Sequence, residues 1–247
     1  MATQSRAKTL LLTRPEPQAT RFARRLVTTY GDSLRVVISP LMRPRYLQPA
    51  LPNRPYTALI LTSETGAEAA RRISAAGKGL PQLAYCVGDR TASVAAACGF
   101  QPVSAQGDAD ALVALIAGRG GTGPLLFLHG AETRGTVAER LNSAGIETDS
   151  AVVYDQIACP LTDEARASLT LPDPVLLPLF SPRTARLFAD QAQDIAPRAP
   201  LWVAALSPAV AAETASLAPE RLEIARTPEA ESMLLALAAL IVAGQGS

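Results

Sequence analysis

The sequence predicts an α/β protein made of two similar domains, each with a parallel β-sheet flanked by helices. Three observations lead to this prediction. Short apolar runs alternate with helix-like segments along nearly the whole chain of 247 residues, as in parallel strands joined by helical crossovers. Segments near the start recur in the same order about 116 to 119 residues later. Two proline-containing stretches stand at equivalent points of these repeats.

The strands are predicted from short apolar runs that are bounded by glycine, proline and polar turn residues. Runs of this length suit buried parallel strands, whose two faces are both covered by helices. The strands predicted in the first repeat cover residues 9–13, 34–38, 58–61, 83–87 and 102–105. Those predicted in the second repeat cover residues 125–128, 151–154, 175–180, 201–206 and 222–225.

A helical segment is predicted after most of these strands, because apolar residues there recur at helical spacing. Prolines at 15 and 17 suit the first turn of the first helix, and glycines such as Gly31 and Gly145 end helices. The residues predicted to face inward on the first, fifth and last helices are Ala19, Phe22, Ala23 and Leu26; Val137 and Leu141; and Met233, Leu237, Leu240 and Ile241.

Two crossings between domains are predicted. Five prolines between residues 40 and 55 disfavour a helix and indicate an extended segment, and a second crossing follows Cys159-Pro160. Crossings at matching points of the repeats mean that the chain leaves domain 1 early, builds domain 2 and returns. The predicted bounds are 1–38 with 161–247 for domain 1, 45–153 for domain 2, and 39–44 with 154–160 for the linker. The alternative is a long surface loop within a single domain.

Composition narrows the function. The net charge is +1 and no long Lys/Arg stripe is present, which argues against nucleic acid as a partner. The longest apolar stretch, residues 233–243, is too short to span a bilayer, and no signal peptide is visible. The three cysteines are scattered without metal-ligand spacing, as expected for free thiols in a reducing cytoplasm. A single histidine cannot form a His-rich metal site, so we expect no metal.

Candidate binding residues stand where predicted strands end and helices begin. In open α/β sheets this edge binds ligands, and helix N-termini with hydroxyls can hold anions there. The candidates are Arg14 after Thr13, Thr62 with Ser63, Gly88 to Thr91, His129 with Gly130, Ser181, and Ser207. Each serine or threonine could instead be a plain N-cap, and His129 a polar turn residue. Gly118 to Gly123 matches GxGxxG but precedes a strand, so we interpret it as a turn.

Tyr154 ends the predicted strand 151–154, next to the second crossing. In the repeat its counterpart is Ile38, so the phenol has no match in the other half. A phenol at that place could donate a proton to a leaving group. The alternative is that Tyr154 is a packing residue.

Eight segments along the chain form a pattern whose order and spacing are more specific than any one of them. They are Leu12-Thr-Arg14-Pro15, Leu61-Thr-Ser63 with Gly66 and Ala67, Val87-Gly88-Asp-Arg-Thr91-Ala92, Gly99-Phe100, Leu128-His-Gly130-Ala-Glu132-Thr-Arg134-Gly135, Val152-Val-Tyr154, Phe180-Ser181-Pro-Arg183 and Leu206-Ser207-Pro208. In these segments, which cover nearly the whole chain in order, the chain resembles the uroporphyrinogen-III synthase family.

The resemblance implies two flavodoxin-like α/β domains joined by a two-stranded linker, with an active-site cleft between them. It implies that the protein is a lyase, and specifically a hydro-lyase, of porphyrin and haem biosynthesis. Such an enzyme closes the linear tetrapyrrole hydroxymethylbilane to uroporphyrinogen III, inverting the last pyrrole ring and losing water without a cofactor. It also implies a cytoplasmic monomer whose partner is this small molecule. By resemblance Tyr154 assists the leaving group, while Ser63, Thr91 and Ser181 bind the substrate.

Two departures from the family pattern concern binding. His129 stands where an arginine is common, and the turn after Ser207 lacks a threonine, so that Thr91 is the one clear copy. Two alternatives remain open at this stage. One is a two-lobed, non-catalytic protein that binds a small anionic ligand, and the other is a regulatory family member that no longer catalyses.

Overall fold

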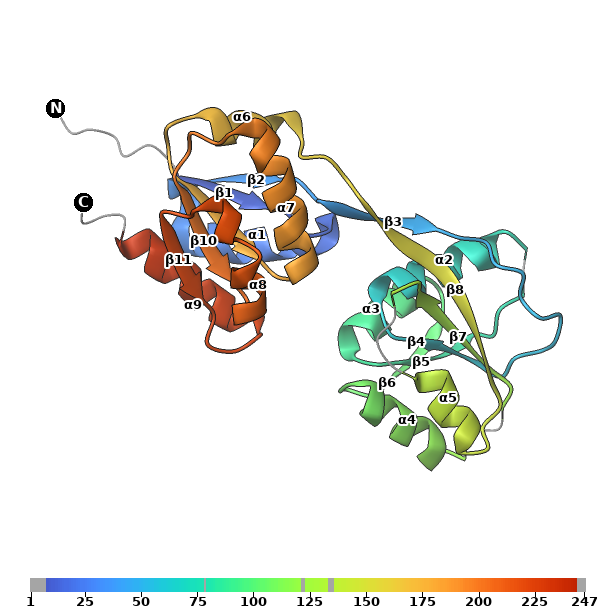
Figure 1. Ribbon diagram of the computed structural model, residues 1–247. Coiled ribbons are helices and arrows are strands. Elements are labelled where there is room, and N and C mark those ends of the chain that lie inside the picture. Colours follow the sequence, from blue (N-terminus) through green and yellow to red (C-terminus); the bar gives the residue numbers. More distant parts are fainter. Residues whose placement is uncertain (1–7, 78, 121–122, 133–135, 244–247) are drawn as a thin grey trace. The chain divides into compact units, whose positions relative to one another are not determined.

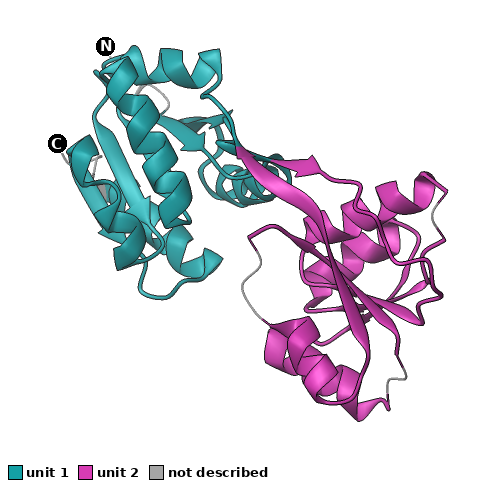
Figure 2. Cartoon of the chain, turned by 45° about the vertical axis from the view of Figure 1, so that its right-hand side comes forward, with its two compact units in different colours: residues 1–43, 158–247 teal, residues 44–157 magenta. Residues whose placement is uncertain are grey.

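The computed structural model describes residues 8–77, 79–120, 123–132 and 136–243. Part of the GxGxxG match, residues 121–122, and residues 133–135 of one family-like segment lie outside the described residues. The chain forms two compact units (Figure 2). Unit 1 comprises residues 1–43 and 158–247, and unit 2 comprises residues 44–157. Whether these units are independently folding domains with the predicted bounds stays a prediction.

Unit 1 contains a five-stranded sheet in the order β2-β1-β9-β10-β11, and its pairings are parallel. In chain order the strands read 2-1-3-4-5 across the sheet, which is the flavodoxin-like arrangement. The strands are β1 (Lys8–Leu12), β2 (Leu34–Ile38), β9 (Val175–Leu179), β10 (Leu201–Ala205) and β11 (Arg221–Ile224).

Unit 2 contains a six-stranded sheet in the order β3-β8-β7-β4-β5-β6. Strands β4 to β8 pair in parallel, and β3 adds to the edge beside β8. The strands are β3 (Met42–Tyr46), β4 (Ala58–Leu61), β5 (Leu83–Cys86), β6 (Gln101–Ser104), β7 (Leu125–Gly130) and β8 (Thr148–Ala158).

Helices cover both faces of each sheet, as right-handed crossovers between parallel strands require (Figure 1). In unit 1, α1 and α9 cover one face while α6, α7 and α8 cover the other. In unit 2, α2 and α3 cover one face while α4 and α5 cover the other. The helices are α1 (Glu16–Tyr30), α2 (Glu64–Ala75), α3 (Asp89–Ala97), α4 (Ala109–Gly118), α5 (Val137–Ser143), α6 (Asp163–Thr170), α7 (Pro182–Ile195), α8 (Pro208–Ala212) and α9 (Ala230–Ala243), with 3-10 turns at Gly31–Ser33 and Ala215–Leu217.

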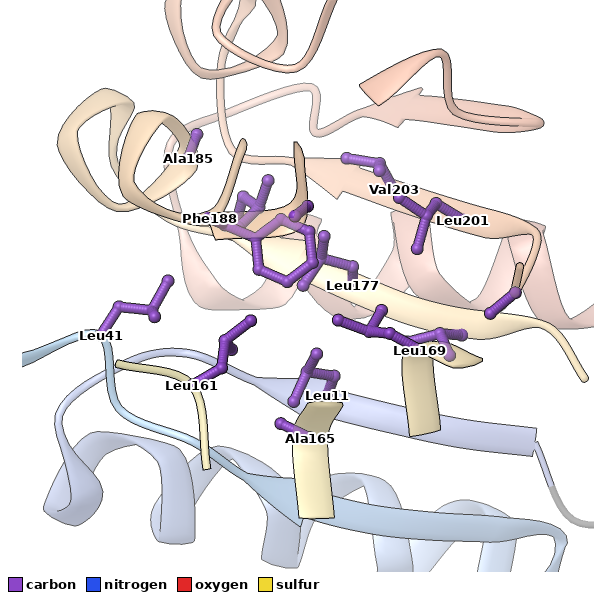
Figure 3. Close-up of a cluster of buried hydrophobic side chains, with 14 of the residues drawn as sticks. Leu11, Leu41, Leu161, Ala165, Leu169, Leu177, Ala185, Phe188, Leu201 and Val203 are labelled. Atoms are coloured by element: carbon purple, nitrogen blue, oxygen red, sulfur yellow. The ribbon is translucent and has the colours of Figure 1, made fainter. Parts of the chain in front are cut away.

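The core of unit 1 on the α6–α7 side illustrates how the parts of the chain join. Leu11 of β1 and Leu41 beyond β2 pack with Leu161, Leu177 and Phe188, which follow in the sequence only after unit 2 (Figure 3). The strand residues there are fully buried because helices cover both sheet faces. Unit 1 therefore depends on contacts between the two ends of the sequence.

The two sheets have the same strand order once the repeats are matched. If β1 and β2 correspond to β7 and β8, and β4 to β6 correspond to β9 to β11, the two sheets have the same order except for the additional edge strand β3 of unit 2. Leaving β3 aside, each sheet takes two strands from one repeat and three from the other. This agrees with the expectation that each domain combines pieces of both repeats.

The pairing register differs between the matching strand pairs of the two units. Leu12 pairs with Ile38 in unit 1, whereas Leu128 pairs with Ala151 in unit 2. Unit 2 also has a register shift between His129 and Gly130, and its strand β8 is longer than β2. The match of Tyr154 to Ile38 stays a prediction.

Three elements differ in extent from what the sequence suggests. The region after Pro160 contains α6, which Thr162 caps by accepting the Ala165 amide. The helix after Ser207 is only five residues long, followed by a separate 3-10 turn. The predicted strand 151–154 is the middle of an eleven-residue strand, so Tyr154 lies inside β8 rather than at its end.

None of the helices within the described ranges is both long and apolar enough to pass through a bilayer.

Candidate active site

The candidate residues lie at the carboxyl edges of the two sheets, because parallel strands end at one edge. In unit 1, Arg14 follows β1, Ser181 follows β9 and Ser207 follows β10. The candidates of unit 2 follow β4 and β5 or belong to β7 and β8: Thr62, Ser63, Gly88, Thr91, His129, Gly130 and Tyr154. The structure thus gathers three predicted residues on one sheet edge and seven on the other.

Three of the predicted serines are N-caps. Ser63 Oγ accepts the amide proton of Gly66 at 2.9 Å, and Ser181 Oγ accepts that of Thr184 at 3.2 Å. Ser207 Oγ accepts from Val210 at a longer 3.4 Å. The backbone of Ser63 (φ −152°, ψ 153°) and of Ser181 (φ −149°, ψ 149°) is nearly identical. Capping is therefore one role of these serines, as the alternative interpretation expected.

Ser63 also contacts Tyr154. The Ser63 Oγ and Tyr154 Oη atoms are 3.0 Å apart, although 91 residues separate them in the sequence. This contact arises because β7 lies between β4 and β8, so that the turn after β4 faces the middle of β8 across one strand. The Tyr154 backbone is held as well, since its carbonyl oxygen accepts the Ala131 amide at 2.9 Å.

Gly130 lies directly against the Tyr154 ring. A Cβ atom at position 130 would come within 2.6 Å of the Tyr154 Cε2 and Cζ atoms. The register shift after His129 pairs Gly130 with Tyr154 and so brings the ring onto bare backbone. The absence of a side chain at Gly130 is therefore what leaves room for the phenol.

His129 does not join this group. Side chains two residues apart in a strand point to the same face, so the His129 side chain lies on the face of Phe127. The His129 ring lies beside Phe127, with the ring centres 4.8 Å apart, and lines a hollow of about 200 Å³ with Val137 and Glu139. This hollow is on the α4–α5 face, whereas Tyr154 packs with the α2–α3 cluster.

The turn after β5 holds the remaining candidates of unit 2. Gly88 is the N-cap residue of α3 and makes no side-chain cap, and Thr91 is buried in the first turn, with a relative exposure of 5%. Cys86 ends the same strand, and burial raises the pKa of its thiol to about 11. The thiol is therefore protonated at neutral pH and cannot serve as a nucleophile at this edge.

The structure adds a residue that sequence reasoning missed. Phe180, at the end of β9, lies beneath Arg14 with the guanidinium carbon 3.9 Å from the ring centre. The sequence contained the residue but no signal for the contact, because β1 and β9 are neighbours only in the folded sheet. In unit 2, Gly66 emerges as the amide donor that fixes the Ser63 hydroxyl.

The larger hollows lie elsewhere. One of about 360 Å³ in unit 1 adjoins Pro200 and Leu201 at the amino end of β10. Another of about 350 Å³ in unit 2 adjoins Tyr56 and Leu80 before β4 and β5. Both are at the amino edges of the sheets, where none of the polar turns of the candidate site is present. The described residues contain no group of three or more His, Cys, Asp or Glu side chains placed to hold a metal ion.

Comparison with known proteins identifies a family. The family model described as "Uroporphyrinogen-III synthase HemD" matches residues 25–234. The crystal structure of uroporphyrinogen-III synthetase from Helicobacter pylori 26695 is similar with a TM-score of 0.60 and 19% identity, covering 94% of this chain and 99% of that one. A mutant uroporphyrinogen III synthase from Thermus thermophilus gives a TM-score of 0.46 and 11% identity, covering 96% of this chain and 100% of that one. No curated protein matches the chain.

Proposed function

This chain belongs to the uroporphyrinogen-III synthase family, and on that premise we propose how its residues act. Enzymes of this family are lyases that close hydroxymethylbilane to uroporphyrinogen III in tetrapyrrole biosynthesis. The last pyrrole ring is inverted and one water is lost. The chain binds the small-molecule substrate with residues of the two carboxyl edges, and Tyr154 assists the departure of the hydroxyl group.

The chemistry makes two demands on the protein. The hydroxymethyl group must lose its oxygen to give an electrophilic azafulvene, which a substituted pyrrole carbon then attacks to give a spiro intermediate. The flexible chain of four pyrroles must also be held so that this carbon, rather than the free end, reacts. Closure without an enzyme favours the uninverted isomer, so orientation of the chain contributes most of the selectivity.

The observation that carries the proposal for catalysis is the placement of the Tyr154 phenol. It is held at the carboxyl edge of unit 2 by Ser63 at 3.0 Å and lies on bare backbone at Gly130. A phenol held in this way can place its proton on a departing hydroxyl, which is a general-acid role. The Cys86 thiol is fully buried in the core and therefore shielded from a substrate at this edge.

Binding of the substrate's eight carboxylates is assigned to helix N-termini and hydroxyls. Helices α2, α3 and α7 begin at the carboxyl edges, at Ser63, Gly88 and Ser181, and their first turns present amide protons and the positive end of the helix dipole. Arg14 adds a cation to the edge of unit 1. Ser207 contributes least, because α8 has five residues. Thr62, Thr91, His129 and Gly130 complete the proposed binding set.

The finer description of partners and location also belongs to this proposal. A net charge of +1 supports a function without nucleic acid, and the free cysteines support a reducing, cytoplasmic location. We propose that the chain acts as a monomer, as the family resemblance implies. The cleft between the domains that the family resemblance implies stays a prediction.

Turnover of hydroxymethylbilane, with separation of the type I and type III isomers, tests the function. We expect type III product from the wild type and a decrease in kcat of about 100-fold or more for Tyr154→Phe. Tyr30→Phe, at the end of α1, is the matched control and should retain activity. Type I product alone, at the spontaneous rate, would instead support a non-catalytic binding or regulatory protein. Full activity of Tyr154→Phe would remove Tyr154 from the reaction.

A further inference from the structure

We infer that Ser63 is both a cap and a positioning residue for Tyr154, in place of the substrate donor that the family resemblance implies: its hydroxyl donates to the phenol oxygen and so turns the phenol proton toward the substrate. The inference rests on the catalytic role proposed for Tyr154. It concerns unit 2 alone, where all the protein atoms involved lie.

The contacts of Ser63 Oγ define the question. A serine hydroxyl has one proton to donate and two lone pairs to accept with. One lone pair accepts the Gly66 amide proton at 2.9 Å, and the phenol oxygen of Tyr154 lies 3.0 Å away. Distance alone allows either oxygen to be the donor in the second contact. The direction of the hydrogen bond between Ser63 and Tyr154 therefore depends on whether the serine proton has another acceptor.

The matching serine of unit 1, Ser181, indicates the direction of this hydrogen bond. This N-cap serine accepts the Thr184 amide and donates its own proton to Thr184 Oγ1 at 2.9 Å. The residue at the same place after Ser63 is Gly66, which has no side chain and offers no such acceptor. Among the contacts of Ser63 Oγ in the described structure, the Tyr154 oxygen takes the place of Thr184 Oγ1. The replacement of Thr by Gly thus frees the serine proton for the phenol.

The amide of Gly66 strengthens this arrangement. An amide that donates to a hydroxyl oxygen polarises the hydroxyl and makes it a better donor in turn. Ser63 also stands at the positive end of α2, where its oxygen is held by the helix rather than by solvent. Gly66 is suited to this close approach, because a Cβ atom there would come 3.2 Å from Ser63 Oγ.

This hydrogen bond determines where the phenol proton of Tyr154 points during the reaction. With Ser63 as donor, the phenol oxygen accepts on the serine side and its own proton points elsewhere. That proton passes to the hydroxyl oxygen of the substrate as the C–O bond breaks and water leaves. The electron pair of the pyrrole nitrogen stabilises the positive charge that develops on the carbon. Ring closure later releases one proton from the last pyrrole, which returns to the phenolate. Water is then the one other product.

A double-mutant cycle tests the inference. Ser63→Ala should lower kcat for type III product by about 10-fold, as for loss of one hydrogen bond, while KM stays within about 3-fold. In the Tyr154→Phe background the same change should lower kcat by less than about 2-fold, because its effect acts through the phenol. Ser63→Thr, which keeps the hydroxyl, should restore most of the activity. An equal loss in both backgrounds, or a rise in KM with kcat unchanged, would overturn the inference.

Loss of the cap needs its own control. Thr162→Ala removes an N-cap of α6 without touching a residue assigned to the reaction. Its loss of thermal stability should be similar to that of Ser63→Ala, with kcat unchanged. If Thr162→Ala lowers kcat as much as Ser63→Ala does, the effect of Ser63 is one of stability and the inference fails.

A readout without turnover separates this inference from the proposed function. Carbon-13 at Cζ of the five tyrosines can be followed by NMR, with the Tyr154 signal assigned by its loss in Tyr154→Phe. Ser63→Ala should shift the Tyr154 signal and leave the other four in place. An unmoved Tyr154 signal would overturn the inference even in an active enzyme. A shifted signal in a protein that makes no type III product would support the contact while the proposed function fails.

Discussion

The guanidinium group of Arg14 lies over the ring of Phe180, with its carbon 3.9 Å from the ring centre. Phe180 in turn meets the edge of the Phe22 ring, with centres 5.1 Å apart and planes at 87°. Arg14 follows β1 and Phe180 follows β9, so the pairing of these strands brings the cation onto the ring. The ring fixes the direction of a long side chain that would otherwise lose rotational freedom on binding a carboxylate.

Phe180→Leu should therefore weaken substrate binding more than catalysis. We expect KM to rise about 3- to 10-fold, which matches a cation–π contribution of about 1 kcal/mol, with kcat within about 2-fold. Arg14→Lys, which keeps the charge and loses the planar guanidinium, should raise KM in the same way. Steady-state kinetics of type III formation measures both. A fall in kcat at constant KM would show that Arg14 and Phe180 serve the chemical step instead.

Gly130→Ala should damage catalysis through the Tyr154 ring. The new methyl group would come within 2.6 Å of ring atoms, so the phenol must move away from Ser63. Because the ring tip can swing, we expect a loss of less than about 1.5 kcal/mol in stability but a fall in kcat of about 10-fold or more. Gly118→Ala is the control, since nothing lies within 4 Å of a Cβ atom there. Full activity of Gly130→Ala would mean that the ring position is not critical.

Phe188→Ala should destabilise unit 1 strongly. Phe188 of α7 is fully buried among Leu41, Leu161 and Leu177 (Figure 3), and its truncation leaves a cavity. The expected loss is about 3–5 kcal/mol in free energy of unfolding. The single tryptophan, Trp202, is buried in the same unit, so its fluorescence in urea reports on this transition.

The control for this measurement is Leu235→Ala on α9, since Leu235 is 64% exposed. It should change the stability by less than about 0.5 kcal/mol. Equal midpoints for Phe188→Ala and the wild type would contradict the packing described for this core.

Cys86 should make stability depend on pH in the alkaline range. Burial raises the pKa of the thiol to about 11 in the folded chain, against 9.0 for an unperturbed thiol. Above pH 9 the unfolded chain loses this proton before the folded chain does, so the contribution is present below pH 9 and is lost toward pH 11. Cys86→Ala lacks this dependence. The stability gap between wild type and variant should narrow by up to about 3 kcal/mol over that window.

Urea unfolding at a series of pH values measures this gap. Other groups that titrate in the same range contribute equally to both proteins and cancel in the difference. Curves that run parallel from pH 9 to 11 would show that the thiol is not held neutral in the folded chain.

The strands were predictable from the sequence because their signal is local. Apolar runs such as residues 58–61, followed by a capping serine, need only nearest neighbours to be interpreted. The steady offset of the repeats predicted the make-up of the sheets, since it indicated that each sheet contains strands from both halves of the sequence. Helix α6 was missed because proline and polar residues before it suggested a crossing, although Leu161, Ala165 and Leu169 have helical spacing.

The sequence predicts which edge of each sheet carries the candidate site, but it does not predict the contacts between the residues of that site. Ser63 contacts Tyr154 because of the strand order. The pairing of β4 with β7 and of β7 with β8 cannot be predicted from the sequence of any single segment. The register shift at Gly130 is likewise a property of two paired strands, so neither strand's sequence predicts it. His129 stood beside Gly130 in the sequence, yet alternation along β7 puts its ring on the other face.

The shared strand order has a consequence for how the chain folds as the ribosome makes it. Unit 2 is a continuous stretch, residues 44–157, and can close as soon as β8 has emerged. Strands β1 and β2 emerge first but their sheet is completed by β9, more than half the chain later, so that sheet has to wait. Contacts so distant in sequence form slowly, and two apolar strands of an unfinished sheet are exposed meanwhile. The earliest strands of the nascent chain are thus the ones most in need of a chaperone.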